Sequence, residues 1–149
     1  MGKGNISASL EDYLETIYEI IEEKQGVKAV EISRRLGVGR SSVTEALKNL
    51  ADKGLVNYGR YDVISLTGAG ENAAKKVRFK HQVLYDFLAQ ILGVSPQEAQ
   101  ENACRLEHVI SEDVLNRLIA FIEFNKQFHC GKHNYLEEFR RFHSENKKL

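Results

Sequence analysis

The sequence predicts a mainly α-helical protein, with a winged helix-turn-helix domain in residues 1–72 and a helical domain in residues 73–149. Three observations lead to this prediction. Apolar residues recur at helical spacing over most of the chain, a Gly-containing turn separates two short helical segments, and two strand-like segments follow directly. Two short helices joined by such a turn form a helix-turn-helix, and a hairpin immediately after them forms a wing.

Three helices are expected before the hairpin. The first begins after Ser9 as its N-cap and ends near Glu23, with acidic side chains in its first turn. The second covers residues 30–36 and ends at a turn over residues 37–39. The third is capped by Ser41 or Ser42 and reaches about Lys53, with Gly54 at the position where a helix commonly ends.

The remaining elements follow from turn and cap residues. Strands are expected at residues 55–58 and 63–66, followed by a long helix at 69–92 that Thr67 caps. Ser95 and Pro96 open the next helix, whose apolar positions are Ala103, Leu106 and Val109. Ser111 caps a further helix, and a last amphipathic helix covers residues 134–142 before a frayed tail.

Charge is distributed unevenly along a chain whose formal net charge is zero. Residues 1–23 contain one lysine and six acidic residues, whereas residues 24–60 contain eight basic and three acidic residues. A basic block is typical of phosphate binding, and an acidic block is suited to cation binding. The basic block coincides with the helix-turn-helix, which predicts binding to double-stranded DNA.

The second helix of a helix-turn-helix enters the major groove, where its N-terminal residues meet base edges. In this chain the side chains at that position suit bases and phosphates. The candidate DNA contacts are Arg40, Ser41, Ser42, Thr44 and Lys48, together with Arg60 at the tip of the wing. The plainer interpretation is a solvated helix face with ordinary serine capping.

Three groups of side chains are candidates for metal ligands. Asp12 and Glu15 are three residues apart on one face of the first helix, and His81 adds an imidazole from the long helix. The third group, Cys104, Glu107 and His108, combines thiolate, carboxylate and imidazole at helical spacing, a mixture that suits first-row transition metals. None of the groups completes a coordination sphere alone. The plainer interpretation is that the acids serve the helix dipole and that the cysteine is a small core residue.

Other classes of function are less well supported. His129, Cys130 and His133 form a weaker zinc candidate. The chain has no HExxH, no Gly-rich phosphate loop and no nucleophile elbow, so we do not expect an enzyme. No run of about 18 apolar residues and no signal-peptide pattern occur, so we expect a cytoplasmic protein with no membrane contact and with reduced cysteines. A winged-helix regulator that senses no metal remains the alternative.

Several segments together resemble the iron- and manganese-dependent repressor family, the group of the diphtheria toxin repressor and the manganese transport regulator. The resemblance covers nearly the whole chain, and its most specific segment is CRLEH. The segments are LEDYLETIY at 10–18, VGRSSVT at 38–44, LTGAG at 66–70, His81 in the long helix, and CRLEH at 104–108. The resemblance implies a winged-helix domain followed by a helical dimerisation domain, and therefore a homodimer. The chain ends too early for the additional barrel domain of the iron branch. In this respect the chain resembles the manganese branch.

The resemblance also implies ligand roles. Asp12 and Glu15 match the first-helix ligands of the manganese branch, and His81, Glu107 and His108 match ligands found in the family. Cys104 departs from the manganese branch, which has a carboxylate there, and agrees with the iron branch. The implied function is metal-dependent repression of metal-ion homeostasis genes, with Mn²⁺ or Fe²⁺ as co-repressor.

Overall fold

The computed structural model describes residues 6–24, 26–59, 64–128 and 135–146. The chain folds into two compact units, Met1–Arg78 and Phe79–Leu149, and the division falls inside helix α4 (Gly68–Asp86). It lies a few residues beyond the boundary expected after residue 72. No described helix combines the length and the apolar composition that crossing a membrane requires.

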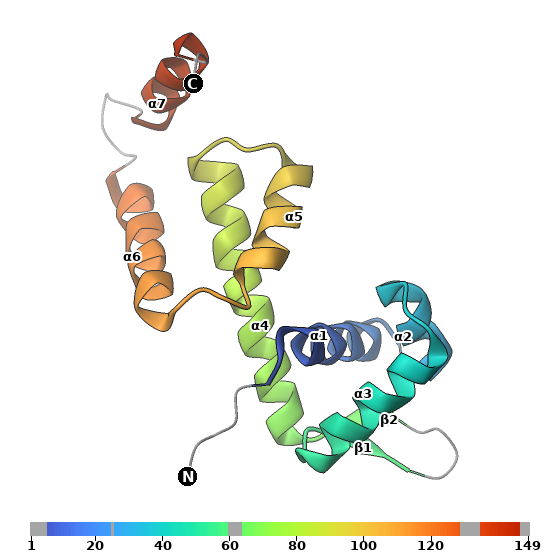
Figure 1. Ribbon diagram of the computed structural model, residues 1–149. Helices are drawn as coiled ribbons and strands as arrows, with labels where there is room; N and C mark the ends of the chain where they lie inside the picture. The colour runs from blue at the N-terminus through green and yellow to red at the C-terminus, as the bar shows by residue number, and fades with distance from the viewer. Residues whose placement is uncertain (1–5, 25, 60–63, 129–134, 147–149) are drawn as a thin grey trace. The chain divides into compact units, whose positions relative to one another are not determined.

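The first unit is a winged helix-turn-helix, as the sequence predicts (Figure 1). Strands β1 and β2 pair in antiparallel register, with Asn57 opposite Ser65. The elements in order are α1 (Ala8–Glu23), α2 (Ala29–Leu36), α3 (Arg40–Asp52), β1 (Val56–Tyr58), β2 (Ile64–Leu66) and the first part of α4. The core is formed where α1, α2 and α3 pack together, and its fully buried side chains include Leu14, Ile17, Ile32, Leu47 and Leu50.

Two predicted helix caps are wrong. Ser7 rather than Ser9 caps α1, since its Oγ accepts a hydrogen bond of 3.3 Å from the backbone N–H of Leu10. Ile6, just before this cap, packs against the core and fixes where the chain enters the helix. Helix α3 starts after Gly39, whose extended backbone serves as the N-cap without a side-chain bond. Ser41 and Ser42 therefore lie exposed within the first turn of α3.

The start of α4 is fixed tightly against the wing. Thr67 Oγ1 donates to the carbonyl oxygen of Gly54 at 2.7 Å and accepts from the N–H of Gly70 at 3.0 Å, which confirms Thr67 as the cap. A Cβ atom added to Gly70 would lie 1.9 Å from the carbonyl oxygen of Leu55. Only glycine permits this approach between α4 and the chain leading into β1.

The second unit is helical. After the end of α4 it contains a π-helical segment η1 (Phe87–Ile91), then α5 (Pro96–Leu106), α6 (Glu112–Phe128) and α7 (Tyr135–Glu145). Val83, Ile91, Leu115 and Ile122 form its buried core. The predicted caps of α5 and α6 are confirmed, because Ser95 Oγ accepts from Glu98 N–H and Ser111 Oγ accepts from Val114 N–H.

The long helix does not continue regularly to Leu92, contrary to the prediction from the sequence. It changes to π-helical winding at Phe87, with the N–H of Leu92 bonded to the carbonyl oxygen of Phe87 at 3.0 Å. Arg140 in α7 donates to the carbonyl oxygen of Gln90 at 2.8 Å, which satisfies one acceptor near the end of this segment. Helix α7 continues to Glu145, past its expected end at Phe142.

Candidate functional site

A buried carboxylate lies at the end of α5. Helix α5 ends at Leu106, so Glu107 is its C-cap and His108 lies in the following turn rather than inside the helix. Helical spacing continues from Cys104 to Glu107, because the N–H of Glu107 still bonds to the carbonyl oxygen of Ala103 at 3.0 Å. The Glu107 residue is 1% exposed and is one of only two buried polar or charged residues in the described chain.

Two imidazoles and a thiol surround this carboxylate. Glu107 Oε2 lies 2.6 Å from Nδ1 of His81 in α4, and Glu107 Oε1 lies 3.4 Å from Nε2 of His108. The Cys104 Sγ joins His81 and Glu107 in a group whose ligand atoms all lie within 4.8 Å of one another. The structure therefore brings together, within the second unit, four of the six residues predicted as metal ligands.

The chemistry of this group fits a divalent transition metal. Within the described chain, Glu107 Oε1 is buried and has no hydrogen-bond partner, since the 3.4 Å contact with His108 lacks hydrogen-bond geometry. A buried carboxylate oxygen without a partner is costly, and a cation removes that cost. Thiolate, carboxylate and imidazole are all ligands of first-row metals.

Asp12 and Glu15 belong to the first unit. Both lie on α1, three residues apart and therefore on one face, and both are partly exposed. The weaker zinc candidate, His129, Cys130 and His133, lies outside the described residues.

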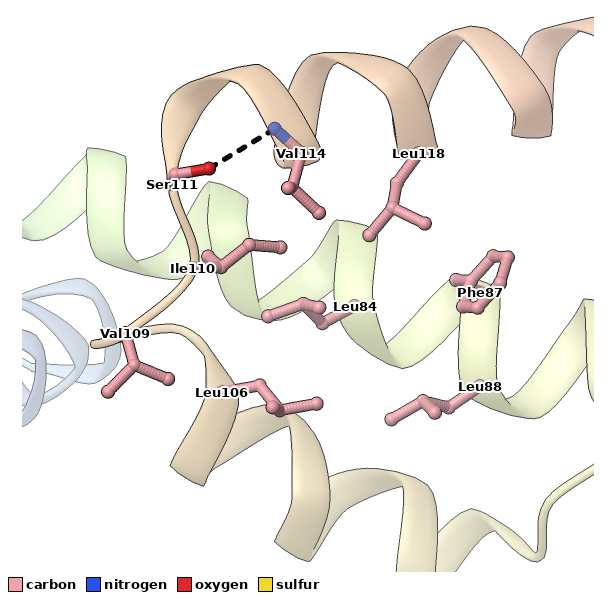
Figure 2. A pocket seen from close by; sticks show the side chains of 9 residues that line it. All are labelled: Leu84, Phe87, Leu88, Leu106, Val109, Ile110, Ser111, Val114 and Leu118. Carbon is pink, nitrogen blue, oxygen red and sulfur yellow. Dashed lines mark hydrogen bonds between the residues drawn. The ribbon is translucent and has the colours of Figure 1, made fainter.

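An apolar pocket of about 430 Å³ lies in the second unit between α4, α5 and α6 (Figure 2). Its lining residues are Leu84, Phe87, Leu88, Leu106, Val109, Ile110, Ser111, Val114 and Leu118. Leu106 and Val109, expected simply as apolar positions of α5, are 40% and 76% exposed. Within residues 104–110, the candidate ligands Cys104, Glu107 and His108 are therefore interspersed with the pocket-lining Leu106, Val109 and Ile110. Sequence reasoning missed this pocket, although four apolar residues among 106–114 gave a signal.

Helix α3 presents a polar face. Val43, Ala46, Leu47 and Leu50 are buried, while Arg40, Ser41, Ser42 and Lys48 are exposed on the other side. Thr44 is partly exposed, and its hydroxyl donates to the carbonyl oxygen of Arg40 at 3.0 Å. Five of the six candidate DNA contacts thus lie on α3, and Arg60 lies outside the described residues.

Ion pairs hold the helix-turn-helix together. Arg35 in α2 binds Glu23 of α1 and also Glu31, and Lys24 binds Glu31. The hydrogen bond from Arg35 lowers the pKa of Glu23, and the bonds from Lys24 and then Arg35 lower the pKa of Glu31. The Arg35–Glu23 pair therefore links α2 to α1, beside the apolar core against which α3 packs.

Comparison with known families gives two matches that together cover most of the chain. Residues 5–63 match the iron-dependent repressor N-terminal DNA-binding domain. Residues 67–139 match the iron-dependent repressor metal-binding and dimerisation domain. The second match favours the metal-dependent interpretation over a winged-helix regulator that senses no metal.

Individual relatives point to the same family as the two domain matches. An uncharacterised helix-turn-helix transcriptional regulator of Methanocaldococcus jannaschii is 42% identical over 119 residues, 79% of this chain and 95% of the relative. The transcriptional regulator MntR of Escherichia coli is 36% identical over 114 residues, 76% of this chain and 73% of the relative. A solved manganese-dependent transcriptional repressor in complex with manganese is 32% identical with a TM-score of 0.71, over 77% of this chain. This chain covers 53% of that solved chain. The chain therefore belongs to the iron-dependent repressor family, with that family's DNA-binding domain followed by its metal-binding and dimerisation domain.

Proposed function

We propose that this chain is a homodimeric repressor of metal-ion homeostasis genes that binds double-stranded operator DNA in the cytoplasm, with Mn²⁺ or Fe²⁺ as its co-repressor. The observation that carries the proposal is the buried Glu107 carboxylate, which has one oxygen at His81 and the other without a hydrogen-bond partner in the described chain. Relatives named as transcriptional regulators support a regulator rather than an enzyme.

Six side chains are proposed to hold the metal. Glu107 and the imidazoles of His81 and His108 supply hard and borderline donors, and Cys104 supplies a soft one. Asp12 and Glu15 are proposed to complete the set from α1. When bound, the metal supplies positive charge that compensates the Glu107 carboxylate. The thiolate favours Fe²⁺, whereas the additional carboxylates favour Mn²⁺. Both ions are therefore proposed as candidate co-repressors.

Metal and DNA are proposed to strengthen each other's binding. The proposed ligands come from both units of the chain, so metal held by all of them would restrain the DNA-binding unit in the dimer. Half-sites lie about one helical turn of DNA apart, roughly 34 Å, and the recognition helices must match that spacing. By linkage the two affinities rise by the same factor, typically about 1–3 kcal/mol.

Arg40, Ser41, Ser42, Thr44 and Lys48 of α3, with Arg60 of the wing, are proposed to contact the operator. The exposed serines and Arg40 in the first turn of α3 are suited to base edges, and Lys48 and Arg60 are suited to phosphates. The apolar pocket and the exposed Leu106 and Val109 are proposed to pack against a second copy of this unit.

Operator binding tests the proposal. The chain is stripped of metal with a chelator and titrated with Mn²⁺, anaerobic Fe²⁺ or Zn²⁺ while fluorescence anisotropy of operator DNA is followed at fixed salt, because phosphate contacts make affinity depend steeply on salt. We expect Mn²⁺ or Fe²⁺ to tighten binding about tenfold or more. Equal binding with and without every metal would remove the sensor and leave a winged-helix DNA-binding protein.

Matched variants locate the two sites. His108→Ala and Glu15→Gln should weaken metal-dependent binding, while His143→Ala and Glu11→Gln, which remove the same groups elsewhere, should not. Lys48→Ala should weaken DNA binding without changing metal affinity measured without DNA, and Lys76→Ala on the exposed face of α4 is its control. Cys104→Ser should reduce affinity for Fe²⁺ more than affinity for Mn²⁺.

A further inference from the structure

Glu45 is an exposed carboxylate in the second turn of α3. It lies four residues after Ser41 and three before Lys48, so it shares a helix face with both. The neighbouring Val43, Ala46 and Leu47 are buried and fix which side of α3 faces outward. A carboxylate therefore occupies the centre of the surface that carries the candidate DNA contacts.

No basic side chain among the described residues forms an ion pair with this carboxylate. Glu23 and Glu31 of the same unit are bound by Arg35 and Lys24, but no ion pair or hydrogen bond joins Glu45 to another residue in the described part of the chain. A lone negative charge facing DNA is repelled by phosphates, which lowers affinity for any sequence. A favourable contact between Glu45 and the DNA is needed to offset this repulsion.

Glu45 also differs chemically from its neighbours. Arg40 only donates hydrogen bonds, and the hydroxyls of Ser41 and Ser42 donate or accept. Thr44 already uses its hydroxyl hydrogen within the helix, on the carbonyl oxygen of Arg40. An ionised Glu45 is the one exposed side chain among residues 40–48 that only accepts. In the major groove, the donor that suits a carboxylate is the N4 amino group of cytosine.

A purely structural role for Glu45 has one candidate partner. Burial, and then the negative charge of Glu45, raise the pKa of the Tyr13 phenol in α1, so the two side chains are neighbours. No hydrogen bond joins them in the described chain, and Tyr13 is packed into the core by its ring. Proximity to Tyr13 therefore locates Glu45 beside α1 without giving the carboxylate a partner.

We propose that Glu45 is a specificity-determining residue that selects cytosine at one position of each operator half-site. The inference rests on the proposed docking of α3 in the major groove. The negative charge lowers affinity for all DNA and restores it only where a cytosine amino group is in reach, so it sharpens discrimination more than it raises affinity.

The test is selection of binding sites from randomised duplex DNA by the full-length chain with saturating Mn²⁺, compared with Glu45→Gln and Asp52→Asn. Asp52→Asn removes the same charge from the last turn of α3, where the helix has left the base edges. We expect the wild-type chain and Asp52→Asn to select one motif with cytosine at one position per half-site. Glu45→Gln should lose that cytosine and gain adenine, which suits a glutamine.

A second measurement modifies the DNA base that Glu45 is proposed to contact. N4-methylcytosine at the selected position still pairs with guanine but presents a methyl group in place of the major-groove amino hydrogen. It should weaken wild-type binding about tenfold, the usual effect of one wrong base pair, and leave Glu45→Gln unaffected.

The outcomes separate the two proposals. A wild-type motif that Glu45→Gln also selects, or wild-type binding that tolerates N4-methylcytosine, overturns the role of Glu45 and leaves the repressor intact. A wild-type chain that selects no motif overturns both.

Discussion

Oε2 of Glu107 lies 2.6 Å from Nδ1 of His81, a contact between residues 26 apart in sequence that joins α4 to the end of α5. The same carboxylate has a second, buried oxygen without a hydrogen-bond partner in the described chain. This pair of facts leads to opposite expectations for the metal-free and the metal-bound protein.

Glu107→Gln should weaken the metal-bound state and spare the metal-free one. The amide removes a buried charge whose desolvation is costly, so the melting temperature in chelator should stay equal or rise. The stabilisation by saturating metal, about 2.7 kcal/mol at a hundredfold excess over Kd, should largely disappear. Thermal unfolding with and without Mn²⁺ measures both. Glu101→Gln on the exposed side of α5 is the control, and equal metal stabilisation in the two variants would contradict the assignment.

Val109→Asp should disrupt the dimer. The side chain is 76% exposed beside the apolar pocket, so a carboxylate there leaves the monomer folded but is buried without a partner when a second copy packs on it. Sedimentation should show monomers at concentrations where the wild type is dimeric. Val30→Asp, at an exposed apolar position of the first unit, should leave the dimer unchanged. A dimeric Val109→Asp chain would place the interface elsewhere.

Gly70→Ala should destabilise the first unit, because its new Cβ would lie 1.9 Å from the carbonyl oxygen of Leu55 and force the backbone apart. Overpacking of this kind costs about 1–3 kcal/mol or more in the free energy of unfolding. A Cβ at Gly68 meets nothing within 4 Å, so Gly68→Ala should change stability by less than about 0.5 kcal/mol. Chemical denaturation of both variants measures the difference, and equal losses would contradict the close approach.

Acid should weaken the helix-turn-helix through Arg35. The pKa values of Glu23 and Glu31 are lowered from 4.5 in the folded state, so their contribution is present above that value and is lost as the pH falls through the lowered folded values. Arg35→Gln removes much of this contribution. Its melting temperature should lie below that of the wild type at pH 7, and the two should converge as the pH falls below the lowered pKa values of Glu23 and Glu31.

The control for this prediction is the neighbouring Arg34→Gln. Arg34 is exposed and lies 3.9 Å from Glu31, too far for a strong pair. It should follow the wild-type melting temperature at every pH. A constant offset between Arg35→Gln and the wild type from pH 7 to pH 3 would show that packing, rather than the ion pairs, accounts for the loss.

The sequence predicted the features that depend on local rules. Thr67, Ser95 and Ser111 are caps because each side chain bonds to an N–H three residues later. The helix-turn-helix and its wing followed from apolar spacing and from Gly37, whose left-handed backbone ends α2. The cap of α3 was misjudged because Gly39, without a side chain to signal it, starts the helix before the two serines.

Features that depend on distant contacts were not predictable. The π-helical winding at Phe87 leaves no mark in the apolar spacing, and Arg140, which bonds to Gln90, is 50 residues away. The spacing of Cys104, Glu107 and His108 indicated a shared face but not that Glu107 is buried. Nor did it indicate that Leu106 and Val109, next to those ligands in the sequence, remain exposed.

The mixture of ligand and pocket-lining residues within residues 104–110 limits which sequence changes this stretch can tolerate. Point substitutions can alter a ligand or a pocket-lining residue separately, because the two kinds point to different surroundings. A single residue inserted before Leu106 would instead shift the register, so that Leu106 takes the position of Glu107 and His108 takes the position of Val109. Length in this stretch should therefore be far more constrained than residue identity, and a library of one-residue insertions would find its sharpest loss of function there.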